Sequence, residues 1–416
     1  MVLKSLTGYF LFLLAAFLLC ENKRARLAKS WRPIVLGILF QLVVLFALTN
    51  VPVCVSAIEC IASGVMKLKD ATIEGTKFVF GYVGGGDLPF EMKEGGMVFV
   101  FAFQVLPTVI LVSALSALLT HFRILPFFSK IIGYVFRTIF RISSNVGMVA
   151  AAKIFVGQLE APLLIRHKLP MLPRSEMFII LALAFATTSA AVMPIYASVL
   201  NDICPDAMRH IIISTVIGVI SVLIVSSIAM PSESASTSSG GAVENNSPYS
   251  SFMNAVTKGL SDGAFVWWCI VGSLIGTIAL IALVNYILAL LPDYAGTPIT
   301  LQRIFGVFMY PFAWLMGIDA QDLTAVSQII GTKMAVNETV AFFDLAKAGI
   351  SPESVVKTIY AINNFGNFSC IGITVAGLSA IAPGQKSITE LVGRAFVAGF
   401  LATGLSSTLF SVFFTF

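Results

Sequence analysis

Long apolar stretches recur along this chain, and they constrain its fold more than any other feature. A helix needs about 17 to 25 mostly apolar residues to cross the hydrocarbon core of a membrane. Runs of this kind lie at residues 3–20, 33–56, 97–120, 176–200, 210–230, 264–291, 354–380 and 391–416. We therefore predict eight transmembrane helices. The first run is expected to be a retained span and not a signal peptide, because the basic stretch follows it instead of preceding it.

The composition supports a membrane protein over a soluble one. Hydrophobic residues make up 57% of the 416 residues and charged residues only 11%, whereas about 25% of the residues of a typical soluble protein are charged. The net charge of +5 is modest and gives no reason to expect a nucleic-acid partner. The six cysteines form no CxxC pair and the three histidines are far apart, so no metal site is predicted. The expected fold class is an all-α polytopic membrane protein.

Basic loops orient the predicted spans, because Lys and Arg are enriched on the cytoplasmic side of a membrane. They follow the first span, follow the third span and precede the last one: Lys23, Arg24, Arg26, Lys29 and Arg32; Arg123, Lys130, Arg137 and Arg141; Lys386 and Arg394. Alternating spans place all three loops on one side, which is then cytoplasmic, with both termini outside. We expect a multi-pass protein of the plasma membrane, which in a bacterium is the inner membrane.

Two further apolar stretches, 149–166 and 323–347, carry charged and polar residues in their middle. This pattern favours re-entrant hairpins over full spans, because irregular backbone at membrane depth has to be shielded from lipid. Residues 121–142 mix basic and large apolar side chains at helical spacing. That mixture is typical of an amphipathic helix lying at the membrane interface.

The two halves of the chain look related, because each has an interrupted hairpin followed by two spans. Paired interrupted segments of this kind predict an inverted repeat and mark the binding site of a transporter. The predicted units are scaffold spans at 1–120, an interfacial helix at 121–148, a first transport repeat at 149–230, a polar cytoplasmic linker at 231–256, a scaffold span at 257–300 and a second transport repeat at 301–416.

Two carboxylates at membrane depth are the first candidates for chemistry. Glu160 follows Gln158 in "GQLE", and Glu338 follows Asn337 in "VNE". A charged side chain at the bilayer centre costs about 2.5 to 3.5 kcal/mol on insertion scales, so it has to face a wet cavity or a partner. An ion pair or a side chain reaching out from a helix end is the alternative. Their matched positions, each beside an amide, favour ligand binding.

Carboxylates and amides together suit a neutral ligand with several hydroxyl groups, because Glu accepts hydrogen bonds while Gln and Asn both donate and accept them. The stretch "NFGNFSC" adds Asn367 and an aromatic face from Phe365 or Phe368. A ring for stacking, an amide and a carboxylate indicate a sugar that carries an aromatic base.

At these residues the sequence resembles the concentrative nucleoside transporter family. The resemblance is carried in order by "FAFQVLPTVILVSALSALL", "VGQLEAPLLIR", "KMAVNETVAFFDL" and "NNFGNFSCIGI", along essentially the whole chain. It implies eight spans, two re-entrant hairpins and interfacial helices, assembled as a homotrimer. It also implies a fixed scaffold part and a transport part that carries the nucleoside across the membrane like an elevator.

By position, the resemblance implies a role for each residue of the predicted site. Gln158 and Glu160 would contact the base, with Leu159 between them. Glu338 and Asn367 would hold the ribose hydroxyls, beside Cys370. The remaining implied members are Phe365 and Val192, which would line the pocket, Asn337, which would support the second hairpin, and Lys153, Val156, Thr187 and Thr188, which form the region where a cation would be coupled.

Three residues depart from the family pattern. Leu159 stands where Thr or Ser is usual, which removes one base contact and leaves the base preference open. Cys370 stands where Ser is frequent, and a thiol is a weak hydrogen-bonding group. Lys153 stands where sodium-coupled members commonly have an Asn ligand. A lysine there would repel sodium, so we favour proton coupling over sodium coupling. The alternative is that Lys153 extends to the interface and sodium binds through other ligands.

The predicted function is cation-coupled import, or symport, of nucleosides, with no enzymatic step and no cofactor apart from the coupling ion. The alternatives are a carrier for nucleobases or another small polar solute, and an intramembrane enzyme using Glu160 and Glu338 as acid and base. No nucleophile–base pair or metal motif in the sequence supports the enzyme.

Overall fold

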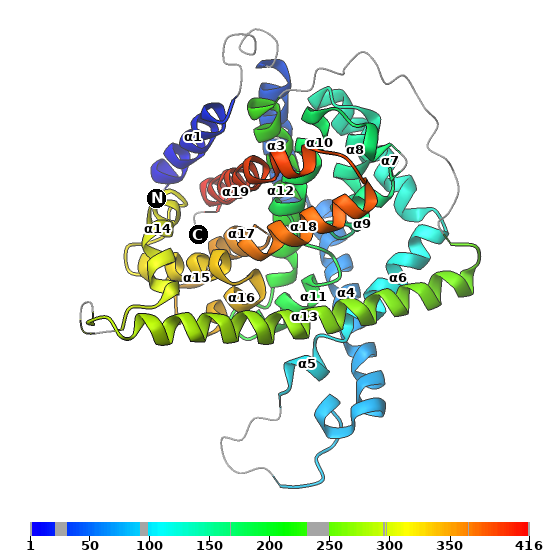
Figure 1. Ribbon diagram of the computed structural model, residues 1–416, viewed down its shortest axis with the longest axis vertical. Helices are drawn as coiled ribbons and strands as arrows, with labels where there is room; N and C mark the ends of the chain where they lie inside the picture. The colour runs from blue at the N-terminus through cyan, green and yellow to red at the C-terminus, as the bar shows by residue number, and fades with distance from the viewer. Residues whose placement is uncertain are drawn as a thin grey trace.

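In a computed structural model of the chain, every regular element of the described part is a helix (Figure 1). The structure describes residues 2–20, 31–91, 99–166, 168–230, 249–293, 296, 298–364 and 366–414. Most of the predicted linker, 231–248, lies outside these residues, as do four basic residues of the first loop, Lys23, Arg24, Arg26 and Lys29. An all-helical architecture with long apolar helices confirms the predicted class of helical membrane protein.

Five segments of the described residues are long and apolar enough to cross a membrane. They are α3 (Trp31–Asn50), the segment Phe101–His121 with α5 (Phe101–Gln104) and α6 (Thr108–His121), α12 (Ala207–Ala229), α13 (Phe252–Leu288) and α19 (Ser387–Phe413). The N-terminal α1 (Val2–Leu18) is apolar but shorter. Helix α13 begins at Phe252, inside the stretch predicted as linker, four residues before the predicted end of that linker at 256.

The two remaining predicted spans, 176–200 and 354–380, are each broken into two helices. The first consists of α10 (Arg174–Ala186) and α11 (Met193–Leu200), and the second of α17 (Pro352–Ile362) and α18 (Phe368–Ile381). The breaks fall at the polar stretches Thr187–Ser189 and Asn363–Asn367. Each break leaves backbone groups without helical partners, and such groups are tolerated at membrane depth only inside protein or around a cavity.

Each interrupted hairpin is a pair of helices joined by a turn. The first pair is α8 (Ser144–Ala152) and α9 (Glu160–Leu163), followed by the short η2 (Leu169–Met171). The second pair is α15 (Leu323–Ala335) and α16 (Glu338–Lys347). We call these pairs hairpin 1 and hairpin 2.

One further helix precedes each hairpin and packs against its first arm. These helices are α7 (Ile124–Phe140), at the predicted interfacial segment, and α14 (Leu301–Leu315). Glycines allow both contacts: a Cβ atom on Gly147 would lie 2.6 Å from Gly133 O, and one on Gly331 would lie 2.6 Å from Gly306 N. Backbones that approach this closely leave no room for a side chain at either crossing.

Helix α4 (Pro52–Phe80) is the largest element that the sequence analysis missed. It has 29 residues, ends in η1 (Gly81–Gly84), and its lower end projects beyond α13 in Figure 1. Its sequence carries Glu59, Lys67, Lys69, Asp70, Glu74 and Lys77, so it has neither the apolar length of a span nor an obvious loop composition. Helix α14 was missed as well.

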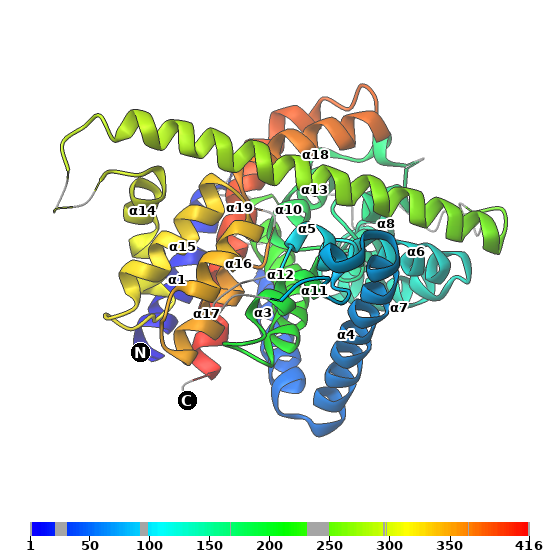
Figure 2. The same ribbon diagram turned by 90° about the horizontal axis from the view of Figure 1, so that it is seen from below.

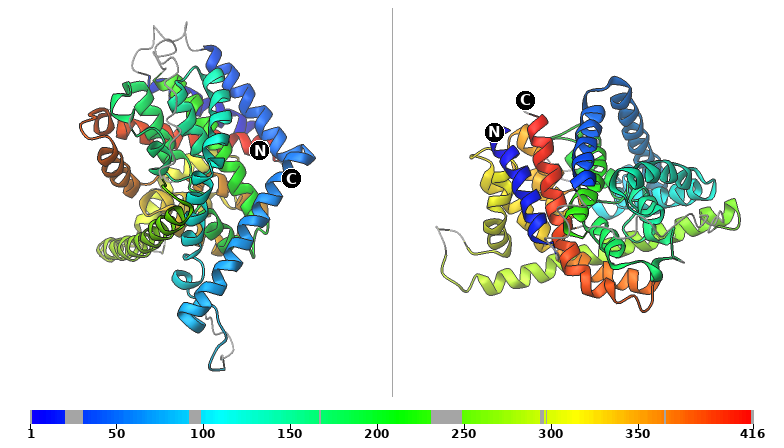
Figure 3. Two further views of the ribbon diagram at one scale, coloured as in Figure 1. Left: turned by 90° about the vertical axis from the view of Figure 1, so that its right-hand side faces the viewer. Right: turned by 90° about the horizontal axis from the view of Figure 1, so that it is seen from above.

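The centre of the molecule is formed by α10, α12 and α19, which are buried along most of their length (Figure 1). Helix α13 crosses one face of the molecule and packs against α6 (Figure 2). Helix α1 lies beside α19 (Figure 3) and also contacts α12 and α14. Helix α1 therefore packs mainly against α19. The predicted scaffold unit of α1 with the spans at 33–56 and 97–120 stays a prediction.

Candidate functional site

Glu338 lies at the turn of hairpin 2, where α16 begins. Asn337 caps this helix, because its side-chain Oδ1 accepts a hydrogen bond from Val340 N at 3.0 Å. The Glu338 side chain is only 7% exposed, and both of its oxygens are bonded. Tyr196 donates its hydroxyl proton to Oε1 at 3.0 Å, and Asn367 Nδ2 donates to Oε2 at 3.0 Å. The predicted pair of Glu338 and Asn367 is therefore assembled by the fold.

Asn367 caps the second half of the broken span. Its Oδ1 accepts hydrogen bonds from Cys370 N at 2.9 Å and from Ser369 Oγ at 2.7 Å, which leaves its amide group to face Glu338. The carboxylate thus lies beside the first residues of both α16 and α18. Because a helix N-terminus carries partial positive charge, two helices favour an anion at this point. This arrangement also fixes which end of the Asn367 amide is the donor.

Tyr196 is a member of this site that the sequence analysis missed. It lies one turn after Val192, which precedes α11 and accepts a hydrogen bond from Tyr196 N at 3.3 Å. The Tyr196 ring stacks on Phe342 of hairpin 2, with ring centroids 4.3 Å apart and planes 11° from parallel. The signal in the sequence was a tyrosine within the predicted span, one turn after Val192. Its hydroxyl group is a donor that the sequence analysis had not assigned.

At the turn of hairpin 1, the Glu160 carboxylate accepts a hydrogen bond from Gly157 N at 3.0 Å and is exposed. Ser189, in the break after α10, lies close by, because a Cβ atom on Gly157 would be 3.5 Å from its Oγ. Gln158 is half-buried, and its Oε1 has no hydrogen-bond partner among the described residues. A buried acceptor without a partner is a group that a ligand donor would satisfy.

Leu159 points its side chain at α18 instead of offering a polar contact. A Cβ atom on Gly377 would lie 2.5 Å from both Leu159 Cδ atoms, so the leucine fills the space that the glycine leaves. Hairpin 1 therefore packs through Leu159 against α18, the helix that Asn367 caps. The residue between the two predicted base-binding side chains thus has a packing role in this chain.

Lys153 ends α8 and is 1% exposed, so its side chain lies inside the protein. It is within electrostatic reach of Glu160 and Cys370. Of the other residues predicted for cation coupling, Val156 is half-buried, while Thr187 and Thr188 are fully buried at the end of α10. Thr187 Oγ1 donates to Leu183 O at 3.1 Å, and Thr188 Oγ1 has no hydrogen-bond partner among the described residues.

Cys370 lies close to buried charged groups of both hairpins. It is 7% exposed at the start of α18, within reach of Lys153 from hairpin 1 and of Lys333 and Glu338 from hairpin 2. The structure therefore brings charged groups of both hairpins to the N-terminal end of α18. Val192, which directly precedes α11 and lies four residues before Tyr196, is also buried.

Comparison with known proteins identifies the family. The models for the N-terminus and C-terminus of the Na+ dependent nucleoside transporters match residues 7–83 and 210–411, and the nucleoside recognition (Gate) model matches residues 102–202. An uncharacterized transporter of Haemophilus influenzae is 30% identical over 423 residues, covering 99% of this chain and 98% of that protein. The chain belongs to the concentrative nucleoside transporter family.

Other members of this family agree with that assignment over their full length. Nucleoside permease NupC of Helicobacter pylori is 27% identical, with 98% of this chain and 97% of that protein covered. The structure of CNTnw in an inward-facing, substrate-bound state has a TM-score of 0.88 to this chain at 26% identity, covering 99% and 97% of the two chains. These relatives are transporters and not enzymes, as the sequence analysis predicted.

The aromatic member of the predicted site has two candidates. Phe365 lies outside the described residues. Phe368 is 49% exposed, and its ring packs against Phe305 and Phe396, with centroid distances of 5.9 and 5.6 Å. The ring of Phe368 therefore belongs to an aromatic cluster with Phe305 and Phe396, and the pocket role implied for Phe365 stays a prediction.

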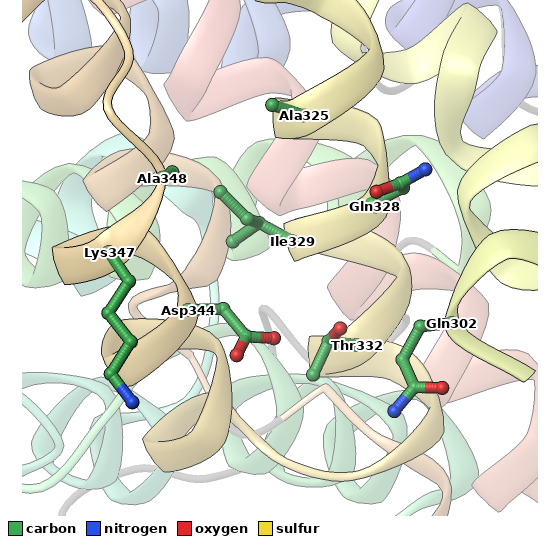
Figure 4. Close-up of a pocket in the computed structure, with 8 residues that line it drawn as sticks. All are labelled: Gln302, Ala325, Gln328, Ile329, Thr332, Asp344, Lys347 and Ala348. Atoms are coloured by element: carbon green, nitrogen blue, oxygen red, sulfur yellow. The ribbon is translucent and has the colours of Figure 1, made fainter. Parts of the chain in front are cut away.

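A separate cavity of about 270 Å³ lies between hairpin 2 and α14 (Figure 4). It is lined by Gln302, Ala325, Gln328, Ile329, Thr332, Asp344, Lys347 and Ala348. None of the predicted site residues lines it. Among the described residues, no group of three or more His, Cys, Asp and Glu side chains is placed to hold a metal ion.

Proposed function

We propose that this protein imports nucleosides across the plasma membrane and binds their ribose at Glu338. The observation that carries the proposal is the Glu338 carboxylate, buried at the start of α16 and α18 and held by Tyr196 and Asn367. A carboxylate has about four lone-pair sites, so two remain for hydroxyl donors. A site that bonds buried hydroxyl groups discriminates strongly against analogues that lack them.

The base would be bound by hairpin 1. Gln158 Oε1 is a buried acceptor without a partner among the described residues, and Glu160 is an exposed acceptor two residues away. Both groups suit the N–H donors on the edge of a nucleobase. Phe365 and Val192 would add apolar contacts. With Leu159 packed on Gly377, hairpin 1 offers fewer polar contacts to the base than hairpin 2 and Asn367 offer to ribose.

The transport mechanism we propose is alternating access of the elevator type. The run α6, α7, hairpin 1, α10–α11 and α12 has the same order of elements as the run α13, α14, hairpin 2, α17–α18 and α19. We interpret the two runs as inverted repeats with re-entrant hairpins, in eight spans and within a homotrimer. CNTnw has been solved in inward-facing and outward-facing states. In this proposal the scaffold comprises the spans within 1–120 and 257–300, and the transport part comprises 149–230 and 301–416.

For the coupling ion we propose protons, with Lys153 as a built-in cation in the place of sodium. The position of Lys153 supports this proposal. The residue lies at the end of α8, is 1% exposed, and is within electrostatic reach of Glu160. A buried ammonium group there would repel a sodium ion. The family models are named for Na+ dependent transporters, so this chain is proposed to differ from that description.

The test is uptake of labelled uridine and adenosine into proteoliposomes that contain the purified protein. Concentrative uptake of unchanged nucleoside supports the proposal, whereas equal competition by free uracil and uridine would identify a nucleobase carrier. Conversion of the compound would identify an enzyme. For coupling, choline replaces sodium on both sides: uptake that continues and rises with an inward proton gradient supports the role of Lys153. Collapse of uptake, restored by an inward sodium gradient, refutes that role.

In the same assay, Lys153→Asn supplies the neutral amide found in sodium-coupled relatives. We expect this variant to transport more slowly without sodium, or to become responsive to it. A variant that keeps the wild-type rate, the wild-type response to an inward proton gradient and the wild-type indifference to sodium would show that Lys153 has no part in coupling.

A further inference from the structure

A second buried lysine lies close to the ribose site without being part of it. Lys333 is in the last turn of α15, on the first arm of hairpin 2, and is 1% exposed. Its Nζ donates a hydrogen bond to Asn364 Oδ1 at 2.5 Å, across the gap to the broken span. A buried ammonium group is costly unless it is paired and hydrogen-bonded, so its presence at this point calls for a physical role.

Asn364 organises the segment that joins α17 to α18. Its Nδ2 donates to Ala361 O at 3.0 Å in the last turn of α17, and its Oδ1 also accepts from Gly366 N at 3.1 Å. The same oxygen therefore holds the lysine and the backbone of the break together. Asn367, the next residue after Gly366, caps α18 and donates to Glu338. A chain of contacts thus runs from Lys333 through Asn364 to the proposed ribose site.

Gly366 leaves the space that the ammonium group needs. A Cβ atom on this residue would lie 3.1 Å from Lys333 Nζ and 3.1 Å from Phe185 O, in the last turn of α10. The lysine is therefore near the carboxyl ends of both broken helices, α10 and α17. Helix C-termini carry partial negative charge, which stabilises a cation at this crossing.

Lys333 is also within electrostatic reach of Glu338 and Cys370. One buried cation and one buried anion thus belong to the same hairpin, on either side of its turn. The helix N-termini next to Glu338 and the helix C-termini next to Lys333 give each group favourable dipoles. Removing the cation would leave the carboxylate without its nearest buried countercharge, which is strongly unfavourable in a protein interior.

We propose that Lys333 is a positioning residue for ribose recognition. Through Asn364 it fixes the segment that aims Asn367 at Glu338, and its charge balances the carboxylate that receives the ribose hydroxyls. Lys333 itself does not touch the nucleoside. This inference rests on the proposed function, namely that Glu338 and Asn367 bind ribose.

A matched control is available in the same part of the fold. Lys357 on α17 is 2% exposed, and its Nζ donates to Gly317 O at 2.9 Å and pairs with Glu353 at 2.6 Å. It is a buried lysine on the same broken span, and its contacts with Gly317 and Glu353 do not lead to Glu338. Lys357→Met therefore reports what the loss of a buried ammonium does to the fold alone.

The experiment compares wild type, Lys333→Met and Lys357→Met in proteoliposomes with equal amounts of correctly folded protein. The measured quantities are KM and maximal rate for uridine, and competition by 2′-deoxyuridine and 3′-deoxyuridine. We expect wild type to prefer uridine at least tenfold over the deoxyuridine that lacks the recognised hydroxyl. Lys333→Met should raise KM at least tenfold and reduce this preference below threefold. Lys357→Met should keep the preference of wild type.

The outcomes separate the two ideas. Wild type that accepts uridine and both deoxyuridines equally refutes ribose binding at Glu338, and with it the role of Lys333. Wild type that discriminates, together with a Lys333→Met variant that keeps the full discrimination, overturns the positioning role alone. A loss of discrimination in Lys357→Met of the same size would also overturn it, because the effect would then follow from any buried lysine.

Asn364 supplies the second pair of variants, in case Lys333→Met is not recovered folded. Asn364→Ala removes the acceptor and should reproduce the loss of preference. Asn364→Asp keeps an acceptor oxygen for Lys333 and Gly366 N but loses the donor to Ala361 O, so we expect a smaller loss of preference than in Asn364→Ala. Full discrimination in Asn364→Ala would contradict the proposal.

Discussion

Replacement of Glu338 by Gln tests the central contact of the site with the smallest change in shape. In wild type, both carboxylate oxygens accept hydrogen bonds, from Tyr196 and from Asn367. A glutamine has one oxygen and one NH2 group. Its NH2 group cannot face the Asn367 amide donor, so its oxygen turns to Asn367 and its NH2 group turns to Tyr196. The Tyr196 hydroxyl proton then loses its acceptor inside the protein.

The expected magnitude follows from these groups. A hydrogen bond to a charged group contributes about 1.5 to 3 kcal/mol, and a ribose hydroxyl bound to Glu338 would lose that charge. Since each 1.4 kcal/mol is a factor of about ten, uridine binding should weaken about 10- to 150-fold. The Tyr196 hydroxyl oxygen can accept from the new NH2 group, but its proton loses the carboxylate acceptor, which adds a penalty of about 1 to 3 kcal/mol that falls on folding in both the free and bound states.

The assay is initial uptake of labelled uridine by proteoliposomes, with KM and maximal rate determined separately. Tyr196→Phe is the control, because it removes the hydroxyl donor but leaves the carboxylate for ribose. We expect it to lose stability while its KM rises less than that of Glu338→Gln. A folded Glu338→Gln protein with a KM close to wild type would remove Glu338 from the binding site and refute the reasoning.

Three further changes test other contacts of the site. Gly377→Ala should displace the Leu159 side chain from α18 and slow uptake several-fold, since the new Cβ would lie 2.5 Å from the leucine. The double variant Gly377→Ala, Leu159→Ala should recover most of the rate, and no recovery would argue against this packing contact. Leu159→Thr should sharpen discrimination among nucleobases in competition assays, and unchanged base preference would contradict our view of hairpin 1. Asn337→Ala should lower the melting temperature, because loss of a helix cap costs about 1 kcal/mol. An unchanged melting temperature would exclude a stabilising hydrogen bond from Val340 N to the Asn337 side chain.

The sequence was sufficient to locate the polar centre of the site. Glu338 and Asn367 were predicted from charge and amide side chains in apolar surroundings, and the structure joins them directly. Such residues are visible in a sequence because their burial is so unfavourable that only a partner or a ligand explains it. The interrupted stretches 149–166 and 323–347 contain hairpin 1 and hairpin 2, whereas the breaks at Thr187–Ser189 and Asn363–Asn367 fall inside two segments that were predicted as continuous spans.

Other features could not be predicted, because their cause is a neighbour far away in the chain. Tyr196 looks like any aromatic residue of an apolar helix until hairpin 2 places Glu338 against its hydroxyl. The packing of Leu159 depends on Gly377, more than two hundred residues later. Helix α4 carries charges along much of its length, so neither apolar length nor periodicity distinguished it from a loop.

The two hairpins carry their lysines at corresponding places, so each hairpin places one buried cation near the site. Lys153 ends the first arm of hairpin 1 and Lys333 lies in the last turn of the first arm of hairpin 2, and both are 1% exposed. Both lie near Cys370, in the first turn of the helix whose cap, Asn367, contacts Glu338. A fixed cation in each hairpin would hold the broken helices together without a bound sodium ion. On this reasoning, loss of Lys333 impairs ribose recognition, whereas loss of Lys153 changes the dependence on sodium, and the two effects should be separable in one protein.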